Sequence, residues 1–125
     1  MGIYHLHNKI EYQSLYNKLK ILTMKKLSRK TMMKWIEDKL NKHNQEQSFW
    51  QPFVRETEDF NGEEGGIWLN GEDMSEYKGK TIYSYYSEDY KNREFGVLNK
   101  WENELKKRGW YSQWYDAGTI MVYEL

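Results

Sequence analysis

The C-terminal run from Phe95 to Leu125 constrains this chain more than any other stretch. Its first half repeats apolar residues at helical spacing, and cations fill the turn before Gly109, where they complement the negative end of a helix dipole. Gly109 tolerates the positive φ that a helix C-terminus favours. The run therefore predicts a helix, a tight stop and a two-stranded β-hairpin. The apolar helix positions are Val97, Leu98, Trp101 and Leu105.

The hairpin loop predicts a register. Asp116-Ala117-Gly118, with glycine last, suits a type I turn followed by a G1 bulge. The expected opposite pairs are Tyr115 with Thr119, Gln113 with Met121, and Tyr111 with Tyr123. Because side chains alternate along a strand, the other face is expected to lie on the helices. That face holds Trp110, Ser112, Trp114, Ile120 and Val122.

Composition narrows the class of protein. With 125 residues, the chain 1–125 is expected to form a single domain. Its formal charge is zero, so bulk charge recruits neither nucleic acid nor a membrane, and the absence of Cys excludes disulfides. No apolar run approaches the roughly 20 residues of a membrane span. The first ten residues lack a signal-peptide layout, so a cytoplasmic location is expected.

The charge is unevenly distributed along the chain. Residues 1–43, the basic helical part, hold ten Lys or Arg against three acids. Residues 44–90, the acidic β-rich part, hold three against eleven, and residues 91–125, the helix plus hairpin, hold six against five. Either the basic helices dock on the acidic middle, or the two charged faces serve different partners.

Hydrophobic spacing predicts the remaining elements. A first helix is expected over about 8–22, and a second after Ser28, which is a good N-cap. An exposed acidic loop is expected at 56–66. Strands are expected at 49–54, 67–69 and 80–86. The predicted fold class is α+β, with two N-terminal helices and one C-terminal helix packed on one face of a mostly antiparallel sheet that ends in a β-hairpin.

Motifs for chemistry are sparse. His5 and His7, in a chain without Cys, do not complete a zinc ligand set, so neither a metal site nor a cofactor is expected. Glu76-x-Lys78, with Asp59 or Asp73, has the spacing of the carboxylate and lysine of many metal-dependent nucleases. Such a triplet arises easily by chance when 30% of residues are charged. The chain is therefore expected not to be an enzyme and to have no catalytic residues.

The stretch from Leu27 to Ile36 resembles the recognition-helix segment of helix-turn-helix proteins of the transposase and MerR kind. A Ser caps the helix, a Thr follows three residues later, and a Trp-aliphatic pair anchors it. The resemblance implies that Arg29, Lys30 and Lys34 face the major groove or its phosphates. The usual glycine of the preceding turn is missing, and a capped amphipathic helix gives the same pattern. DNA binding is therefore the alternative hypothesis.

Aromatic residues supply the leading hypothesis. They make up 17% of the chain, and Tyr and Trp are common at protein–protein contacts. Together with the bias to Lys, Asn and Tyr, typical of AT-rich genomes, they favour a non-enzymatic binding protein of a phage or mobile element. It would inhibit or modulate a host protein such as a defence factor. The sequence also leaves open that the chain forms a homodimer. The expected contact residues are Glu63, Glu64, Trp68, Asp73 and Tyr77 around the acidic loop, and Tyr83, Tyr85 and Tyr86 on a tyrosine strand.

Overall fold

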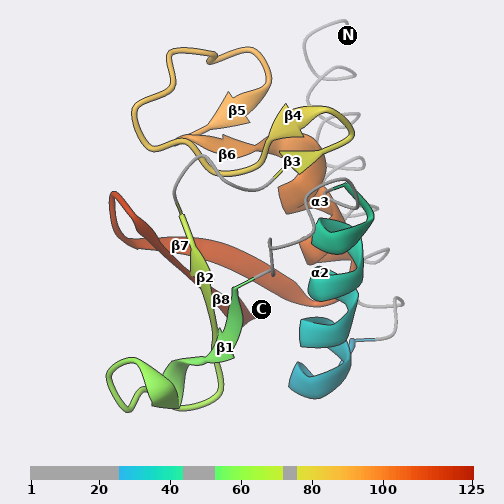
Figure 1. Ribbon diagram of the computed structural model, residues 1–125, viewed down its shortest axis with the longest axis vertical. Coiled ribbons are helices and arrows are strands. Elements are labelled where there is room, and N and C mark those ends of the chain that lie inside the picture. Colours follow the sequence, from blue (N-terminus) through green and yellow to red (C-terminus); the bar gives the residue numbers. More distant parts are fainter. Residues whose placement is uncertain (1–25, 44–52, 72–75) are drawn as a thin grey trace, which may run out of the picture.

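A computed structural model describes residues 26–43, 53–71 and 76–125 of the chain (Figure 1). Within these ranges lie two α-helices, one short 3-10 helix and eight strands. The helices are α2 (Arg29–His43), η1 (Thr57–Asp59) and α3 (Asn99–Lys107). The strands are β1 (Val54–Glu56), β2 (Ile67–Asn70), β3 (Glu76–Tyr77), β4 (Lys80–Thr81), β5 (Arg93–Glu94), β6 (Val97–Leu98), β7 (Trp110–Asp116) and β8 (Thr119–Glu124).

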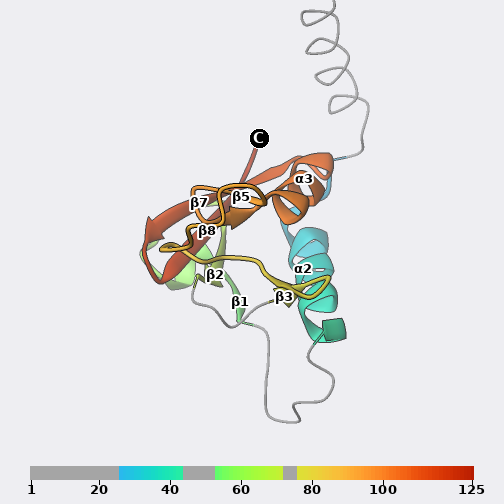
Figure 2. The same ribbon diagram turned by 90° about the horizontal axis from the view of Figure 1, so that it is seen from above.

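The main sheet has four antiparallel strands in the order β1-β2-β8-β7. Its central pair joins distant parts of the chain, because Ile67 of β2 lies opposite Val122 of β8. The pairs β3-β4 and β5-β6 form two further sheets of two strands each. Both described helices lie to one side of the main sheet, as the views in Figures 1 and 2 agree.

The expected fold class was wrong. In place of three helices on one mostly antiparallel sheet, the described residues form two helices and eight strands in three sheets, a fold that is mostly sheet. The expected helix at 8–22 lies outside the described residues. Val97 and Leu98, expected to lie within the C-terminal helix, form β6 instead, and the strand expected at 80–86 ends after Thr81.

A long-range contact explains the change at β6. The Leu98 amide donates to the Ile82 carbonyl (2.9 Å), and Val97 bridges Tyr83. Both β6 residues are buried. Two consecutive buried residues fit the first turn of a helix as well as a buried strand. Apolar spacing alone therefore does not distinguish the two, and the pairing with the chain around Ile82 decides.

The local signals were confirmed. Helix α2 begins after Ser28, whose Oγ accepts the Thr31 amide proton at 3.3 Å, as an N-cap does. Gly109 follows α3 with a φ of 85°. In the hairpin, Tyr111 lies opposite Tyr123 and Gln113 opposite Met121, as expected.

The hairpin register differs at its end. The sheet shows a bulge between Trp114 and Asp116, so Asp116 rather than Tyr115 lies opposite Thr119. The Asp116 carboxylate accepts the Gly118 amide proton at 2.9 Å. This Asx-type turn tightens the loop and moves the bulge from Gly118 to Tyr115.

The core lies between the main sheet and the two helices. Trp110, Ile120 and Val122, expected on the helix-facing side of the hairpin, are buried there. Helices α2 and α3 meet at Trp35 and Trp101, whose rings stack at a centroid distance of 5.3 Å. The other buried apolar residues of this core include Met32, Ile36, Leu40, Ile67, Leu69, Ile82, Leu98 and Leu105.

One buried hydroxyl joins three elements within this core. The Tyr83 hydroxyl accepts a proton from Trp101 Nε1 (2.8 Å) and pairs with Ser112 Oγ (2.9 Å). Burial raises the pKa of Tyr83 far above its usual value. The hydroxyl therefore stays protonated and holds the segment after β4 against α3 and β7.

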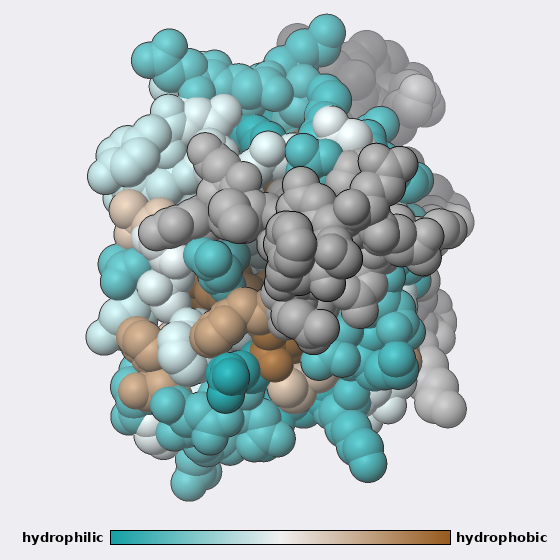
Figure 3. All heavy atoms as spheres, viewed as in Figure 1, coloured by the Kyte–Doolittle hydropathy of each residue, from teal (hydrophilic) through white to brown (hydrophobic). Residues whose placement is uncertain are grey.

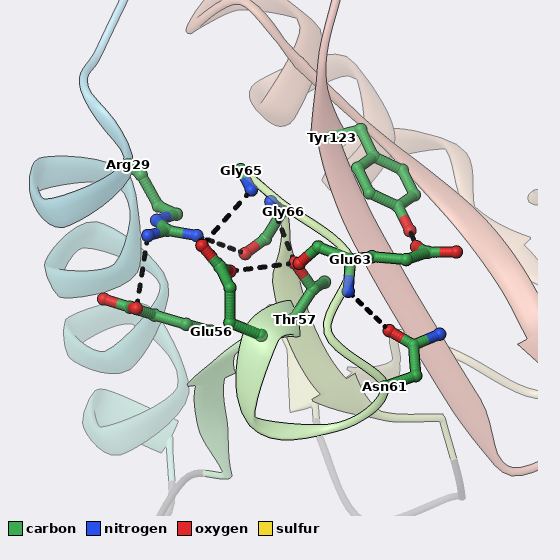
Figure 4. A network of polar contacts seen from close by, with 9 residues as sticks. Arg29, Glu56, Thr57, Asn61, Glu63, Gly65, Gly66 and Tyr123 are labelled. Atoms are coloured by element: carbon green, nitrogen blue, oxygen red, sulfur yellow. Dashed lines mark hydrogen bonds and ion pairs between the residues drawn. The ribbon is translucent and has the colours of Figure 1, made fainter.

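The acidic loop between β1 and β2 docks on α2 through Arg29 (Figure 4). The Arg29 guanidinium contacts Glu58 at 2.6 Å and Glu56 at 3.2 Å, and donates to the Gly66 carbonyl at 3.3 Å. At these residues the basic helix docks on the acidic middle of the chain. The charge segregation of the sequence thus serves folding here.

The same loop is built around Thr57. This side chain is fully buried, donates to the Glu63 carbonyl (2.7 Å) and accepts the Gly66 amide proton (3.0 Å). Figure 4 also shows the Tyr123 hydroxyl donating to the Glu63 carboxylate. The segment 56–66, expected to be an exposed loop, begins with the end of β1 and η1 and has an ordered interior.

Tyr83→Phe should destabilise the fold by roughly 1–3 kcal/mol, because the buried Trp101 indole N–H would lose its acceptor. Urea unfolding followed by tryptophan fluorescence measures this loss. Tyr85→Phe removes the same hydroxyl group from an exposed residue and should change stability by less than about 0.5 kcal/mol. Equal effects of the two substitutions would contradict the role of the buried hydroxyl.

Glu58→Gln should reduce the dependence of stability on acid pH. The hydrogen bond from Arg29 lowers the pKa of Glu58 from 4.5 to about 2. Since the folded-state pKa is the lower one, this carboxylate contributes stability above pH 4.5 that is lost as the pH falls toward 2. Urea midpoints measured from pH 6 to about pH 2 should therefore fall less in Glu58→Gln than in wild type. Glu64→Gln, at an exposed carboxylate of the same loop, is the control and should retain the wild-type profile.

Candidate functional site

Exposed aromatic side chains gather on the segment between β4 and β6. Tyr85 is 49% exposed, Tyr86 82%, Tyr90 81% and Phe95 86%. We refer to these four residues as the aromatic tip. In Figure 1 this segment and the acidic loop lie at opposite ends of the molecule. The space-filling view in Figure 3 shows pale, weakly polar surface in the region of this segment, bordered by hydrophilic teal surface.

The aromatic tip is held at both ends of its segment. The Ser84 amide donates to the Gly96 carbonyl at 2.8 Å, next to the bridge between Tyr83 and Val97. Inside the segment, the Asn92 side-chain amide donates to both oxygens of Asp89, and this contact lowers the pKa of the Asp89 carboxyl. The exposed rings thus project from a segment with its own hydrogen bonds.

Phe95 has an unfavourable backbone conformation. Phe95 and Gly96 form the two-residue loop between β5 and β6, with φ values of 51° and 77°. Positive φ at both positions is the mark of a type I′ turn, which favours Asn or Gly at the first. A phenylalanine there strains the backbone, and its ring is almost fully exposed to water.

Trp114 of β7 supports the tip from the main sheet. Its indole N–H donates to the Phe95 carbonyl at 2.7 Å. The Tyr85 ring packs edge-on against Trp114 at a centroid distance of 5.2 Å and against Tyr86 at 5.1 Å. These contacts fix the tip relative to the core through the same strand that carries Ser112.

Two clefts adjoin the tip, and Phe95, Glu94 and Trp114 line both of them. The tyrosine cleft, of about 820 Å³, also has the three tip tyrosines in its wall. The second, of about 650 Å³, lies between α3 and β7 and is called here the Glu102 cleft. Phe95 therefore lies where the two clefts meet.

Glu102 is an unusual group in its cleft. One carboxylate oxygen accepts the Ser112 amide proton at 2.8 Å. The other oxygen is buried and has no hydrogen-bond partner among the described residues. Burial raises the pKa of Glu102, against the opposing effects of the Ser112 hydrogen bonds and the Lys106 charge.

The structure separates the residues expected to form a partner surface. Tyr85 and Tyr86 lie in the tip, whereas Tyr83 belongs to the core, with 2% of its surface exposed. Glu63 and Glu64 are exposed on the acidic loop at the far end. The acidic loop and the tyrosine segment therefore form two separate surfaces.

The remaining expected contact residues have structural contacts or lie outside the description. Trp68 packs between Phe53 and Phe60 on the outer face of the main sheet, at centroid distances of 4.6 and 4.7 Å. Tyr77 packs against Trp101 at 5.5 Å. Asp73 lies outside the described residues.

The sequence interpretation grouped Tyr90 with the other tyrosines as a possible aromatic surface, but it missed Phe95 and Trp114 as members of the site. The run that begins at Phe95 predicted the C-terminal helix, and Trp114 was expected on the helix-facing side of the hairpin. The signal in the sequence was Gly96. Glycine in a two-residue loop is typical of a tight hairpin turn, and Phe95-Gly96 is such a loop between β5 and β6.

The basic residues of the DNA-binding alternative have other contacts on α2. Arg29 is paired with Glu56 and Glu58, and Lys34 with Asp38 at 2.8 Å. Lys30 is exposed. For Arg29 to reach a phosphate, its two ion pairs would have to break. The helix that would precede α2 in a helix-turn-helix lies outside the described residues.

Two residues of the nuclease-like triplet lie in the β3-β4 hairpin. Glu76 stands on β3 and Lys78 on the following turn, with a φ of 51°. No three or more His, Cys, Asp or Glu side chains come together as metal ligands among the described residues. Within the same ranges, no helix is both long and apolar enough to span a membrane.

Comparison with known proteins found no family model, no curated protein and no solved structure that matches this chain.

Proposed function

We propose that this protein is a non-enzymatic binding protein that docks a partner protein against its aromatic tip. The observation that carries the proposal is the exposure of four large aromatic side chains on one eleven-residue segment, 85–95. Exposed aromatic surface is unfavourable in water, and its burial by a partner is a main source of binding free energy.

The chemistry of the tip favours protein as the partner. Tyr offers apolar surface and a hydroxyl with few rotatable bonds to immobilise, which suits protein interfaces. The tyrosine cleft has two carboxylates, Glu88 and Glu94, in its wall, which would repel a phosphodiester backbone. Among the described residues of its wall the single basic one is Arg93, which donates to the Ile82 carbonyl at 3.2 Å.

The strain at Phe95 supports the same proposal. A positive φ in a non-glycine residue costs on the order of 1 kcal/mol, and the Phe95 ring, 86% exposed, does not offset this cost by burial among the described residues. Local strain that does not serve packing is common at binding sites. We expect the ring to contribute when a partner covers it.

The proposal is tested by capture from low-GC bacterial lysate, with and without nuclease. We expect a protein partner that survives nuclease and is lost from the double variant Tyr86→Ser/Phe95→Ser by roughly tenfold or more. Undiminished capture by the double variant would exclude the tip. Nucleic acid recovered alone, and lost on nuclease treatment, would instead favour the DNA-binding alternative through α2. Retention of a second copy of this chain would identify a homodimer. Inhibition of the partner, and a phage or mobile-element origin, stay predictions.

Phe95→Asn should separate stability from binding. Asparagine suits the left-handed position of the turn, so the free energy of unfolding should rise by about 0.5–1 kcal/mol while partner capture falls. Lys78→Asn is a matched control, because Lys78-Gly79 forms the equivalent loop of the β3-β4 hairpin, with φ values of 51° and 79°. It should stabilise the fold to a similar extent without reducing capture. Urea unfolding measures the change in stability, and the capture assay measures the change in binding. Reduced capture by Lys78→Asn would contradict a specific role of Phe95 in binding.

A further inference from the structure

We propose that the Glu102 cleft receives an arginine side chain of the partner protein. The inference rests on the proposed function, because the cleft adjoins the aromatic tip and shares Phe95 and Trp114 with it. It specifies which side chain of the partner the cleft would recognise. A partner segment lying across Phe95 would insert one guanidinium between α3 and β7.

The charges in the cleft favour a cation. Of the described residues, two carboxylates, Glu94 and Glu102, line it together with one basic residue, Lys106. Burial chiefly raises the pKa of Glu102, the Ser112 hydrogen bonds and the Lys106 charge lower it, and the Glu94 charge has a smaller raising effect. A guanidinium in the cleft would be attracted by both carboxylates, Glu94 and Glu102.

The buried oxygen of Glu102 gives a second reason. A buried carboxylate oxygen without a hydrogen bond is costly, and native proteins have few such atoms. The other oxygen holds the Ser112 amide, so the carboxylate is already oriented by β7. A guanidinium in the cleft would supply the donor that the second oxygen lacks among the described residues.

The aromatic walls suit a planar cation. Phe95, Tyr111 and Trp114 contribute rings to the wall, and a guanidinium stacks on aromatic faces while its edge donates hydrogen bonds. A lysine ammonium is a point charge with a stronger hydration shell and no plane to stack. Arginine is therefore the better fit to a hollow that combines rings with carboxylates.

The protein contains an occupied example of this arrangement. The Arg108 guanidinium lies 4.1 Å from the centroid of the Trp35 ring and donates to the Glu104 carboxylate at 2.8 Å. Ring, guanidinium and carboxylate are all supplied by the chain itself there. In the Glu102 cleft the rings and the carboxylates are present, and the guanidinium would come from the partner.

The test uses small probes and the whole chain. N-acetyl-L-arginine amide is titrated into ¹⁵N-labelled protein, with N-acetyl-L-citrulline amide as the uncharged isostere. We expect arginine amide to shift the Trp114 indole and Ser112 amide resonances in a saturable manner, with citrulline amide binding about tenfold more weakly or not at all. Equal shifts from citrulline amide, or no shift from either probe, would overturn the proposal.

Substitutions locate the effect in the cleft. Glu102→Gln keeps an acceptor for the Ser112 amide and removes the charge, so the fold should persist while the affinity for arginine amide falls about tenfold. Glu94→Gln should also lower the affinity for arginine amide. Glu64→Gln, at the far end of the molecule, should leave it unchanged. Unaltered affinity in both cleft variants would overturn the assignment.

The two proposals fail in different ways. If arginine amide binds as expected but the double variant of Tyr86 and Phe95 still captures a partner, the cleft is a cation site and the aromatic tip is not the docking surface. If the tip variants lose the partner but no probe shifts Trp114, the tip stands and the arginine proposal is overturned.

Discussion

The buried hydroxyl of Tyr83 is the contact on which the described arrangement most depends. It accepts a hydrogen bond from Trp101 of α3 and pairs with Ser112 of β7, so a helix, the main sheet and the segment after β4 meet at one atom. Tyr83 also bridges Val97, which aligns the β5-β6 hairpin with the core. The aromatic tip projects from the segment that this junction holds. Its orientation therefore follows from core packing and not from the loop alone.

Two residues of the described structure have features that cost folding free energy. Phe95 has positive φ with an exposed ring, and Glu102 has a buried oxygen without a hydrogen-bond partner among the described residues. Both residues line the same cleft. Elsewhere the described polar groups are well used, as in the Arg29 and Thr57 network of the acidic loop. Lys78 has the same positive φ in the β3-β4 hairpin, but its loop lines neither cleft, whereas Phe95 and Glu102 line one cleft together. This coincidence supports the proposal of a binding site there.

Sequence reasoning succeeded where the deciding interaction spans a few residues. The Ser28 cap, the Gly109 stop and most of the β7-β8 register depend on neighbours in the chain, and all three were predicted. It failed at Val97 and Leu98, where two buried residues fit a helix or a strand equally well. Of the candidate site, Tyr85 and Tyr86 were predicted, but Tyr83 was placed on the surface because alternation along a strand does not tell which face is covered.

The sequence by itself determined the hairpin, the capped basic helix and the opposite charges of helix and loop, since propensity, capping and charge are local properties of the chain. The tertiary structure decided which strands pair, because β2 must find β8 some fifty residues away through shared burial of apolar side chains. It also decided which aromatic rings are exposed. Tyr83 and Tyr86 are the same residue type three positions apart, yet one is buried under α3 and β7 and the other faces water. That difference comes from long-range packing, which no local pattern encodes.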